Sequence, residues 1–162
     1  MIFVTVGNDG RHFFRLLDHI NVLMQEGDEK FYVQYGNSNH NLKISEEVKP
    51  FFNRKDFKAL LSNSDCIITH AGAGTLLQLA QLGKFPVVVP RLKKYSEHIN
   101  DHQLDIANEF EKKGLCKVVH NINEITFDFI HEIKHHSLKI NNKENIQLKN
   151  SIKNAFQRHI RL

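Results

Sequence analysis

The chain has 162 residues, of which 41% are hydrophobic and 25% are charged, and its formal net charge at pH 7 is +4. That length suits one domain with a sizeable core, and that composition is typical of soluble globular proteins. No apolar run approaches the roughly 20 residues that span a bilayer, and the chain starts directly in a strand-like segment, so we expect a cytoplasmic protein without a membrane helix or signal peptide.

Positive charge gathers toward the C-terminus, where lysines and arginines outnumber the acids. A solvated helix face explains this excess, and so does attraction to an anionic membrane surface; the sequence leaves both interpretations open. Cys66 and Cys116 each lie in a strand-like apolar run, which favours reduced thiols in the core over a disulfide or a zinc site.

Strand-like and helix-like patterns alternate in the N-terminal part of the chain. The predicted order is a strand at 2–6, a helix at 12–25, a strand at 31–35, a polar loop at 36–47, a strand at 48–52 and a helix at 54–63. Pro50 lacks the N–H that a central strand donates, so we expect the third strand to lie at an edge of the sheet or to start near Pro50.

The stretch 65–103 organises the rest of the chain. It contains a buried-strand pattern at 66–69, a glycine-rich turn at 70–75, a helix that stops at Gly83, and a second buried strand at 85–89. Two strands joined in this way run parallel, so the turn lies at their carboxyl ends, where open α/β sheets bind ligands. The small residues and the helix N-terminus suit a phosphate group, although a tight strand-to-helix connection explains them equally well.

The remaining sequence completes the alternation of helices and strands. Its predicted elements are a helix at 102–113, a strand at 115–119, a helix at 124–133 and an amphipathic helix at about 144–160. We therefore predict a single α/β domain over 1–162, with a doubly wound, Rossmann-like, mostly parallel sheet and helices on both faces.

Three common catalytic or nucleotide-binding motifs are missing from the sequence. The first predicted strand ends in Gly7-Asn8-Asp9-Gly10 rather than G-x-G-x-x-G, and the second ends in Tyr35-Gly36-Asn37 without an acidic residue, so NAD binding is not expected. Gly83-Lys84-Phe85 lacks the spacing and the hydroxyl of a P-loop, and no G-x-S-x-G elbow of a hydrolase occurs.

Nine polar or charged side chains follow the strand at 85–89 and Pro90: Arg91, Lys93, Lys94, Glu97, His98, Asn100, Asp101, His102 and Gln103. Because this loop leaves the carboxyl end of its strand, we expect it to overhang the glycine-rich turn. Its cations can neutralise a diphosphate, and Asp101, His102 and Gln103 can hydrogen-bond sugar hydroxyls. His98 and His102 have the spacing of metal ligands on a helix, but Pro90 and the polar run disfavour a helix there, so no metal is expected.

Four segments carry a resemblance to a known family: VTVG, ITHAGAGT, PVVVPR and EHINDHQ, in this order. Together they resemble the nucleotide-sugar-binding subunit of two-part GT-B glycosyltransferases, over about residues 1–125. The likeness is closest to bacterial exopolysaccharide and capsule subunits. The chain is also similar to the soluble subunit of the eukaryotic UDP-N-acetylglucosamine transferase for dolichol-linked chitobiose and, more distantly, to the C-terminal half of the transferase that builds peptidoglycan lipid II, a glycosyltransferase family 28 C-terminal-like domain.

The resemblance implies a UDP-sugar donor site. The segment 70–75 would hold the diphosphate, and the segment 7–9 would line the floor of the crevice. Asp101, His102 and Gln103 would face the donor sugar, and Arg91, Lys93 and Lys94 would stabilise the charge of the departing diphosphate. The complete implied set is Gly7, Asn8, Asp9, His70, Ala71, Gly72, Ala73, Gly74, Thr75, Gln78, Arg91, Lys93, Lys94, Glu97, His98, Asp101, His102 and Gln103. Two positions depart from the family pattern: Ala71 replaces a glycine, which is tolerable if residue 71 has no positive φ, and Gln78 stands near the place of a ribose-binding glutamate.

The resemblance also implies a reaction and a partner. A complete GT-B enzyme has two Rossmann-like domains and about twice this length, so the chain would supply only the donor half. A separate, membrane-anchored subunit would bring the lipid-linked acceptor and the catalytic base. The implied reaction transfers a hexose, with inversion, from a UDP-sugar to a polyprenyl-diphosphate-linked saccharide in exopolysaccharide or capsule synthesis, without a cofactor, at the inner face of the cell membrane.

Other hypotheses stay open at this point. The chain could be a non-catalytic regulatory or scaffolding subunit that keeps the fold, or a self-contained enzyme acting on nucleotide sugars. A homodimer of the isolated chain is compatible with an exposed partner surface. Nucleic acid is not an expected partner.

Overall fold

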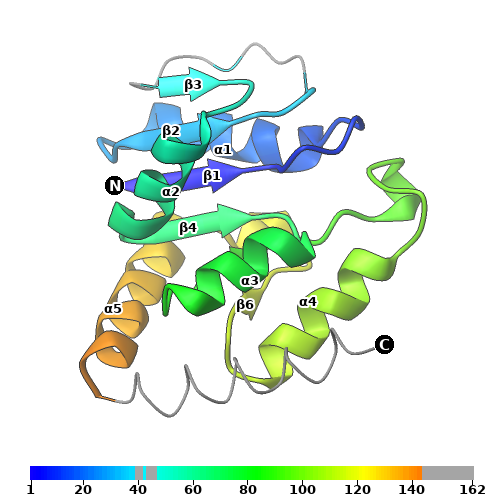
Figure 1. Cartoon of the computed structure of the whole chain (residues 1–162). Helices are drawn as coiled ribbons and strands as arrows, with labels where there is room; N and C mark the ends of the chain where they lie inside the picture. Colours follow the sequence, from blue (N-terminus) through cyan, green and yellow to red (C-terminus); the bar gives the residue numbers. More distant parts are fainter. Residues whose placement is uncertain (39–41, 43–46, 144–162) are drawn as a thin grey trace.

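The structure is a computed structural model that describes residues 1–38, 42 and 47–143. Its centre is a six-stranded sheet in the order β3-β2-β1-β4-β5-β6, and each neighbouring pair runs parallel (Figure 1). The strands are β1 (Ile2–Thr5), β2 (Phe31–Gln34), β3 (Glu47–Lys49), β4 (Cys66–Thr69), β5 (Val87–Val88) and β6 (Lys117–Val118). Successive residues of the central strands alternate between two cores: Ile2 and Val4 pack on one face of the sheet, and Phe3 packs on the other.

Helices cover both faces of this sheet. They are α1 (Phe14–Glu26), α2 (Arg54–Asn63), α3 (Ala73–Gln81), α4 (His102–Lys112) and α5 (Phe127–Lys143), with short 3₁₀ turns η1 (Lys93–Tyr95) and η2 (Ile122–Glu124). The apolar stripes of α1 and α5 pack on the face that carries Ile2 and Val4. Those of α2, α3 and α4 pack on the opposite face. The doubly wound, mostly parallel α/β fold predicted from the sequence is therefore confirmed.

The predicted elements differ from the observed ones mainly at their ends. β3 is an edge strand, as Pro50 indicated, and Pro50 lies directly after its end. The helix predicted at 124–133 instead begins at Phe127, because the preceding residues form the turn η2 and the Thr126 hydroxyl accepts a hydrogen bond from the Phe129 N–H; it continues to Lys143. The amphipathic helix predicted at about 144–160 lies outside the described residues, and no helix of the described part is long and apolar enough to cross a membrane.

The strand order reverses at β1, which has β2 on one side and β4 on the other. The connection after β1 leads to α1 on one face, and the connection after β4 leads to α3 on the opposite face. The two connections therefore diverge and leave a crevice above the carboxyl ends of β1 and β4, which is the usual ligand position in this fold class.

Candidate functional site

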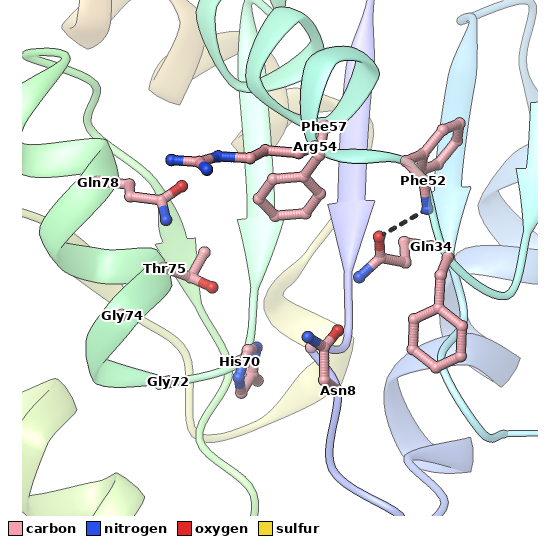
Figure 2. Close-up of a pocket in the computed structure, with 12 residues that line it drawn as sticks. Asn8, Gln34, Phe52, Arg54, Phe57, His70, Gly72, Gly74, Thr75 and Gln78 are labelled. Atoms are coloured by element: carbon pink, nitrogen blue, oxygen red, sulfur yellow. Dashed lines mark hydrogen bonds between the residues drawn. The ribbon is translucent and has the colours of Figure 1, made fainter.

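A cleft of about 610 Å³ opens at this crevice (Figure 2). The turn after β1, the end of β2, the segment between β3 and α2, and the start of α3 all contribute to it. The lining residues are Gly7, Asn8, Gln34, Phe51, Phe52, Arg54, Phe57, His70, Gly72, Gly74, Thr75 and Gln78. Seven of the residues that the sequence singled out are thus brought together: Gly7, Asn8, His70, Gly72, Gly74, Thr75 and Gln78.

His70 follows β4 and is held between two glycines. Its backbone N–H donates to the Thr5 carbonyl, and its Nδ1 lies 3.4 Å from the Thr69 hydroxyl oxygen. A Cβ atom at Gly7 would lie 2.3 Å from the imidazole, and one at Gly72 would lie 2.1 Å from Nε2. Both positions therefore require glycine, and at Gly7 the positive φ of 76° requires it independently. The imidazole is therefore fixed at the floor of the cleft, and only 7% of the surface of His70 is exposed to solvent.

The His70 imidazole is neutral at physiological pH. Burial, together with the nearby positive charge of Arg91, lowers the pKa of His70 from 6.5 to about 4. A neutral imidazole can donate one hydrogen bond and accept another, but it cannot supply a positive charge to a ligand. Charge stabilisation in this cleft must come from other groups.

Folding stability should fall in mildly acidic solution because of His70. Between the pKa near 6.5 of an unfolded histidine and the folded value of about 4, the unfolded chain binds a proton that the folded chain does not, so the free energy of unfolding decreases as the pH falls through this window. The full effect, reached below pH 4, is roughly 3 kcal/mol, and roughly 2 kcal/mol of it falls between pH 7.5 and pH 5. Urea unfolding at pH 7.5 and pH 5 measures it, and His70→Asn should remove that share of the decrease. His12→Asn, at an exposed position, is the control. If the free energy of unfolding falls between pH 7.5 and pH 5 as much in His70→Asn as in His12→Asn, His70 is not the origin of the decrease.

The N-terminus of α3 faces the cleft without obstruction. Gly72 is the N-cap residue, and no side chain of the described residues caps the helix. Ala73 and Gly74 are exposed, and nothing lies within 4 Å of a Cβ atom built at Gly74. Ala71 is fully buried in the core beside α3 and α4. It has no positive φ, so an alanine fits here in place of the glycine that is usual in the family. Free backbone N–H groups and the helix dipole therefore point at whatever occupies the cleft.

Arg91 is not part of the lining. Its side chain is fully buried and donates to the carbonyl oxygens of Val6 at 2.8 Å, Arg11 at 3.0 Å and Glu97 at 3.2 Å. Its guanidinium also lies 4.7 Å from the centre of the Phe13 ring. Arg91 therefore connects the loop after β1 to the loop after β5, and in this structure its charge is directed into the protein rather than at a ligand.

The loop after Pro90 lies beside the cleft but contributes no lining residue. Besides Arg91, two of its predicted site residues are buried: Glu97 pairs with Arg15 at 2.9 Å, and the Gln103 side chain accepts a hydrogen bond from the Arg91 N–H. Lys93, Lys94, Asp101 and His102 are exposed, and the Asp101 carboxylate accepts a hydrogen bond from the Lys93 N–H. His98 is half-buried, and its Nε2 lies 4.0 Å from the Asp9 carboxylate. The sequence grouped this loop with the cleft, and the structure separates the two sets of side chains.

Five lining residues were not predicted from the sequence: Gln34, Phe51, Phe52, Arg54 and Phe57. Arg54 is the first residue of α2, and Figure 2 shows its side chain and that of Gln78 extending toward each other across the cleft. The signal that could have found this wall is an apolar pair, Phe51-Phe52, followed by a helix cap at Asn53 and then a cation. Phe51 remains 44% exposed, which is unusual for a phenylalanine.

The chemistry of the cleft suits an anionic ligand with a flat apolar part. The α3 N-terminus and Arg54 attract negative charge, and the phenylalanines provide apolar surface. Within the described residues, no three histidine, cysteine, aspartate or glutamate side chains group into a metal site.

Comparison with protein families and curated sequences gives a consistent result. The sequence model of the glycosyltransferase family 28 C-terminal domain matches residues 1–161. A UDP-N-acetylglucosamine transferase subunit ALG13 of Yarrowia lipolytica is 32% identical over 102 residues, which is 59% of this chain and 50% of that protein. A UDP-N-acetylglucosamine--N-acetylmuramyl-(pentapeptide) pyrophosphoryl-undecaprenol N-acetylglucosamine transferase of Finegoldia magna is 37% identical over 108 residues, 65% of this chain and 26% of that protein. The chain thus spans half or less of the length of these relatives.

Solved structures share the fold at low sequence identity. The calicheamicin glycosyltransferase CalG4 aligns with a TM-score of 0.65 and 14% identity, over 93% of this chain and 38% of that one. MurG of Acinetobacter baumannii aligns with a TM-score of 0.55 and 16% identity, over 93% of this chain and 49% of that one.

Proposed function

The chain belongs to the family of the glycosyltransferase family 28 C-terminal domain, and on this premise we propose that its cleft binds the diphosphate of a UDP-sugar and presents the sugar for transfer. The observation that carries the proposal is the uncapped N-terminus of α3, which faces the cleft beside a neutral His70 at the reversal point of the sheet. Backbone N–H groups at such a position bind phosphate oxygens without a competing side chain.

The uridine would extend from the diphosphate toward the α2 side of the cleft. Phe51, Phe52 and Phe57 offer aromatic surface to a base, and Gln78 offers an amide to a ribose hydroxyl. Arg54 would supply the positive charge that the sequence had assigned to Arg91, because Arg91 is committed to backbone carbonyls.

In the proposed reaction, a hydroxyl oxygen of the acceptor forms a bond to the anomeric carbon, and the bond from that carbon to the diphosphate oxygen breaks, with inversion. The hydroxyl proton passes to a base, which we assign to a partner subunit, and negative charge collects on the departing diphosphate. The α3 N-terminus contributes roughly 0.3–2 kcal/mol to stabilising that charge. Since this is small for an enzyme, a water-poor interface with a second domain is needed.

We propose that this second domain is a separate, membrane-anchored subunit that binds the acceptor. The ALG13 relatives, which are described as subunits of a transferase, support this proposal. The Finegoldia magna relative is described with a pyrophosphoryl-undecaprenol acceptor, which supports a polyprenyl-diphosphate-linked saccharide as acceptor class here. Exopolysaccharide or capsule synthesis at the inner face of the cell membrane is the narrower form of this proposal.

A regulatory or scaffolding subunit is the alternative. It is favoured by the structural use of Arg91, Glu97 and Gln103, which removes three polar groups from contact with a donor. Reconstitution with the proposed acceptor-binding subunit decides between the two: transfer that stops when the cleft is altered supports catalysis, and transfer that continues supports scaffolding.

Arg54→Ala should weaken binding of UDP-N-acetylglucosamine by about tenfold, because a hydrogen bond between a charged group and phosphate contributes roughly 1.5–3 kcal/mol before losses to solvent. Isothermal titration calorimetry of the isolated chain measures the affinity. Lys55→Ala is the matched control, since Lys55 is the next residue of α2, is exposed and does not line the cleft. Equal affinities in the two variants would contradict the role of Arg54, and no binding by the unaltered chain would contradict the proposed function.

A further inference from the structure

The floor of the cleft contains a row of buried polar side chains. Thr5 ends β1 and is paired in register with Gln34, which ends β2, and with Thr69, which ends β4. Gln34 is 3% exposed, and Thr5 and Thr69 are fully buried. Buried polar groups destabilise a fold unless they are hydrogen-bonded, so three of them side by side call for a physical reason.

Gln34 bonds to both sides of this row. Its side-chain oxygen accepts a hydrogen bond from the Phe52 N–H at 3.1 Å (Figure 2). Its amide nitrogen donates to the Thr5 hydroxyl oxygen at 3.3 Å. The same Thr5 oxygen accepts the Gly7 N–H at 3.3 Å. A continuous path of hydrogen bonds therefore runs from Phe52 through Gln34 and Thr5 to Gly7.

The two ends of this path lie in neighbouring parts of the cleft lining. Phe52 leads directly into the cap of α2, the helix that carries Arg54 and Phe57, while Gly7 lies against the His70 imidazole. These two parts pack closely at the backbone: a Cβ atom at Gly36, two residues after Gln34, would lie 2.9 Å from the Gly7 carbonyl oxygen. A small movement of either part would therefore change the position of the groups that face a ligand.

We propose that Gln34 is a positioning residue that, through Thr5, fixes the position of the Phe52 segment relative to the Gly7 turn and so sets the shape of the cleft for its ligand. This inference rests on the proposed binding of a UDP-sugar for its functional consequence, but the coupling of the two parts can be measured without ligand. Thr69 extends the same row to His70, where its hydroxyl oxygen lies 3.4 Å from Nδ1.

The test uses near-isosteric variants of the full chain. Gln34→Met removes both hydrogen bonds of the amide, Thr5→Val removes the shared oxygen, and Thr5→Ser keeps that oxygen. Ser64→Ala is the matched control, because Ser64 is 2% exposed and its hydroxyl donates to the Leu60 carbonyl at 2.7 Å, away from the cleft. Amide hydrogen exchange of Gly7 and Phe52 is followed by NMR, and affinity for UDP-N-acetylglucosamine by calorimetry.

We expect Gln34→Met to speed exchange about fivefold at Phe52 and also at Gly7, whose own acceptor is untouched by the substitution. Thr5→Val should speed exchange at Gly7 by a similar factor, Thr5→Ser should restore it, and Ser64→Ala should change neither amide. Unchanged exchange at Gly7 in Gln34→Met overturns the inference, whether or not the chain binds a nucleotide.

The ligand measurement separates the inference from the proposed function. We expect Gln34→Met and Thr5→Val each to weaken binding roughly five- to tenfold, and the double variant to lose little more, because both act through one path. Normal affinity in both single variants overturns the inference while leaving the proposed function in place. Absence of binding by the unaltered chain overturns the proposed function, and the exchange rates then decide the coupling alone.

Discussion

Gly72→Ala is expected to lower the affinity for UDP-N-acetylglucosamine at least tenfold and to lower the melting temperature by about 3–8 °C. The backbone is not the cause, since Gly72 has φ −74° and ψ 120°, which alanine adopts readily. The cause is the new methyl group, which would lie 2.1 Å from the Nε2 atom of a buried His70. Overpacking of this kind costs about 1–3 kcal/mol and moves the imidazole away from its position at the N-terminus of α3.

A double-mutant cycle with His70→Ala isolates that collision. Once the imidazole is gone, Gly72→Ala should cost little stability, so the two substitutions should be strongly non-additive in thermal unfolding. Gly10→Ala is the control for a glycine in the same region, because nothing lies within 4 Å of a Cβ atom built there. If Gly72→Ala destabilises the His70→Ala background as much as it destabilises the unaltered chain, the collision is not the origin of the effect.

The fold could be predicted from the sequence because its patterns are local. The buried runs at 66–69 and the helix at 54–63 match β4 and α2 residue for residue, since each is bounded by a cap or a turn residue that the sequence shows. β5 and β6 are shorter than predicted, with two paired residues each. Apolar flanking residues such as Val89 and Leu115 are buried without belonging to those strands, so hydrophobicity alone overestimates strand length.

The glycine-rich turn lies between a strand and a helix, as the sequence predicted. Small residues that follow a buried strand are a local signal for the start of a helix. The opposite wall was missed, because Phe52 and Arg54 reach the cleft through pairing of β3 with β2, a contact that no local pattern encodes. The partners of Arg91 in this structure were not predicted for a related reason. From the sequence, an arginine that follows a strand is expected at the surface. In the structure, the Arg91 guanidinium instead donates to four carbonyl oxygens, those of Val6, Arg11, His12 and Glu97.

Hydrogen bonds of Arg91 and Arg15 join the loop after Pro90 to the turn after β1 and the start of α1. Arg15 pairs with Glu97 through two hydrogen bonds of 3.0 and 2.9 Å and donates a third to the Pro90 carbonyl at 2.9 Å. Glu97 in turn accepts the Leu92 N–H at 3.0 Å. The exposed residues Lys93 and Lys94 are therefore part of a loop that several hydrogen bonds fix, at the edge where the proposed second domain would close.

Arg91→Lys is expected to lower the free energy of unfolding by about 3–5 kcal/mol, because lysine donates from one point and cannot reach carbonyl groups on two loops at once. Urea denaturation measures the loss, and amide exchange should rise at both 7–12 and 92–100. Lys94→Ala, on the same loop but exposed, should leave stability unchanged. If Arg91 instead bound the diphosphate, Arg91→Lys would keep its stability and lose nucleotide affinity in a salt-dependent way; that result would return Arg91 to the site and would require the loop after Pro90 to move on binding.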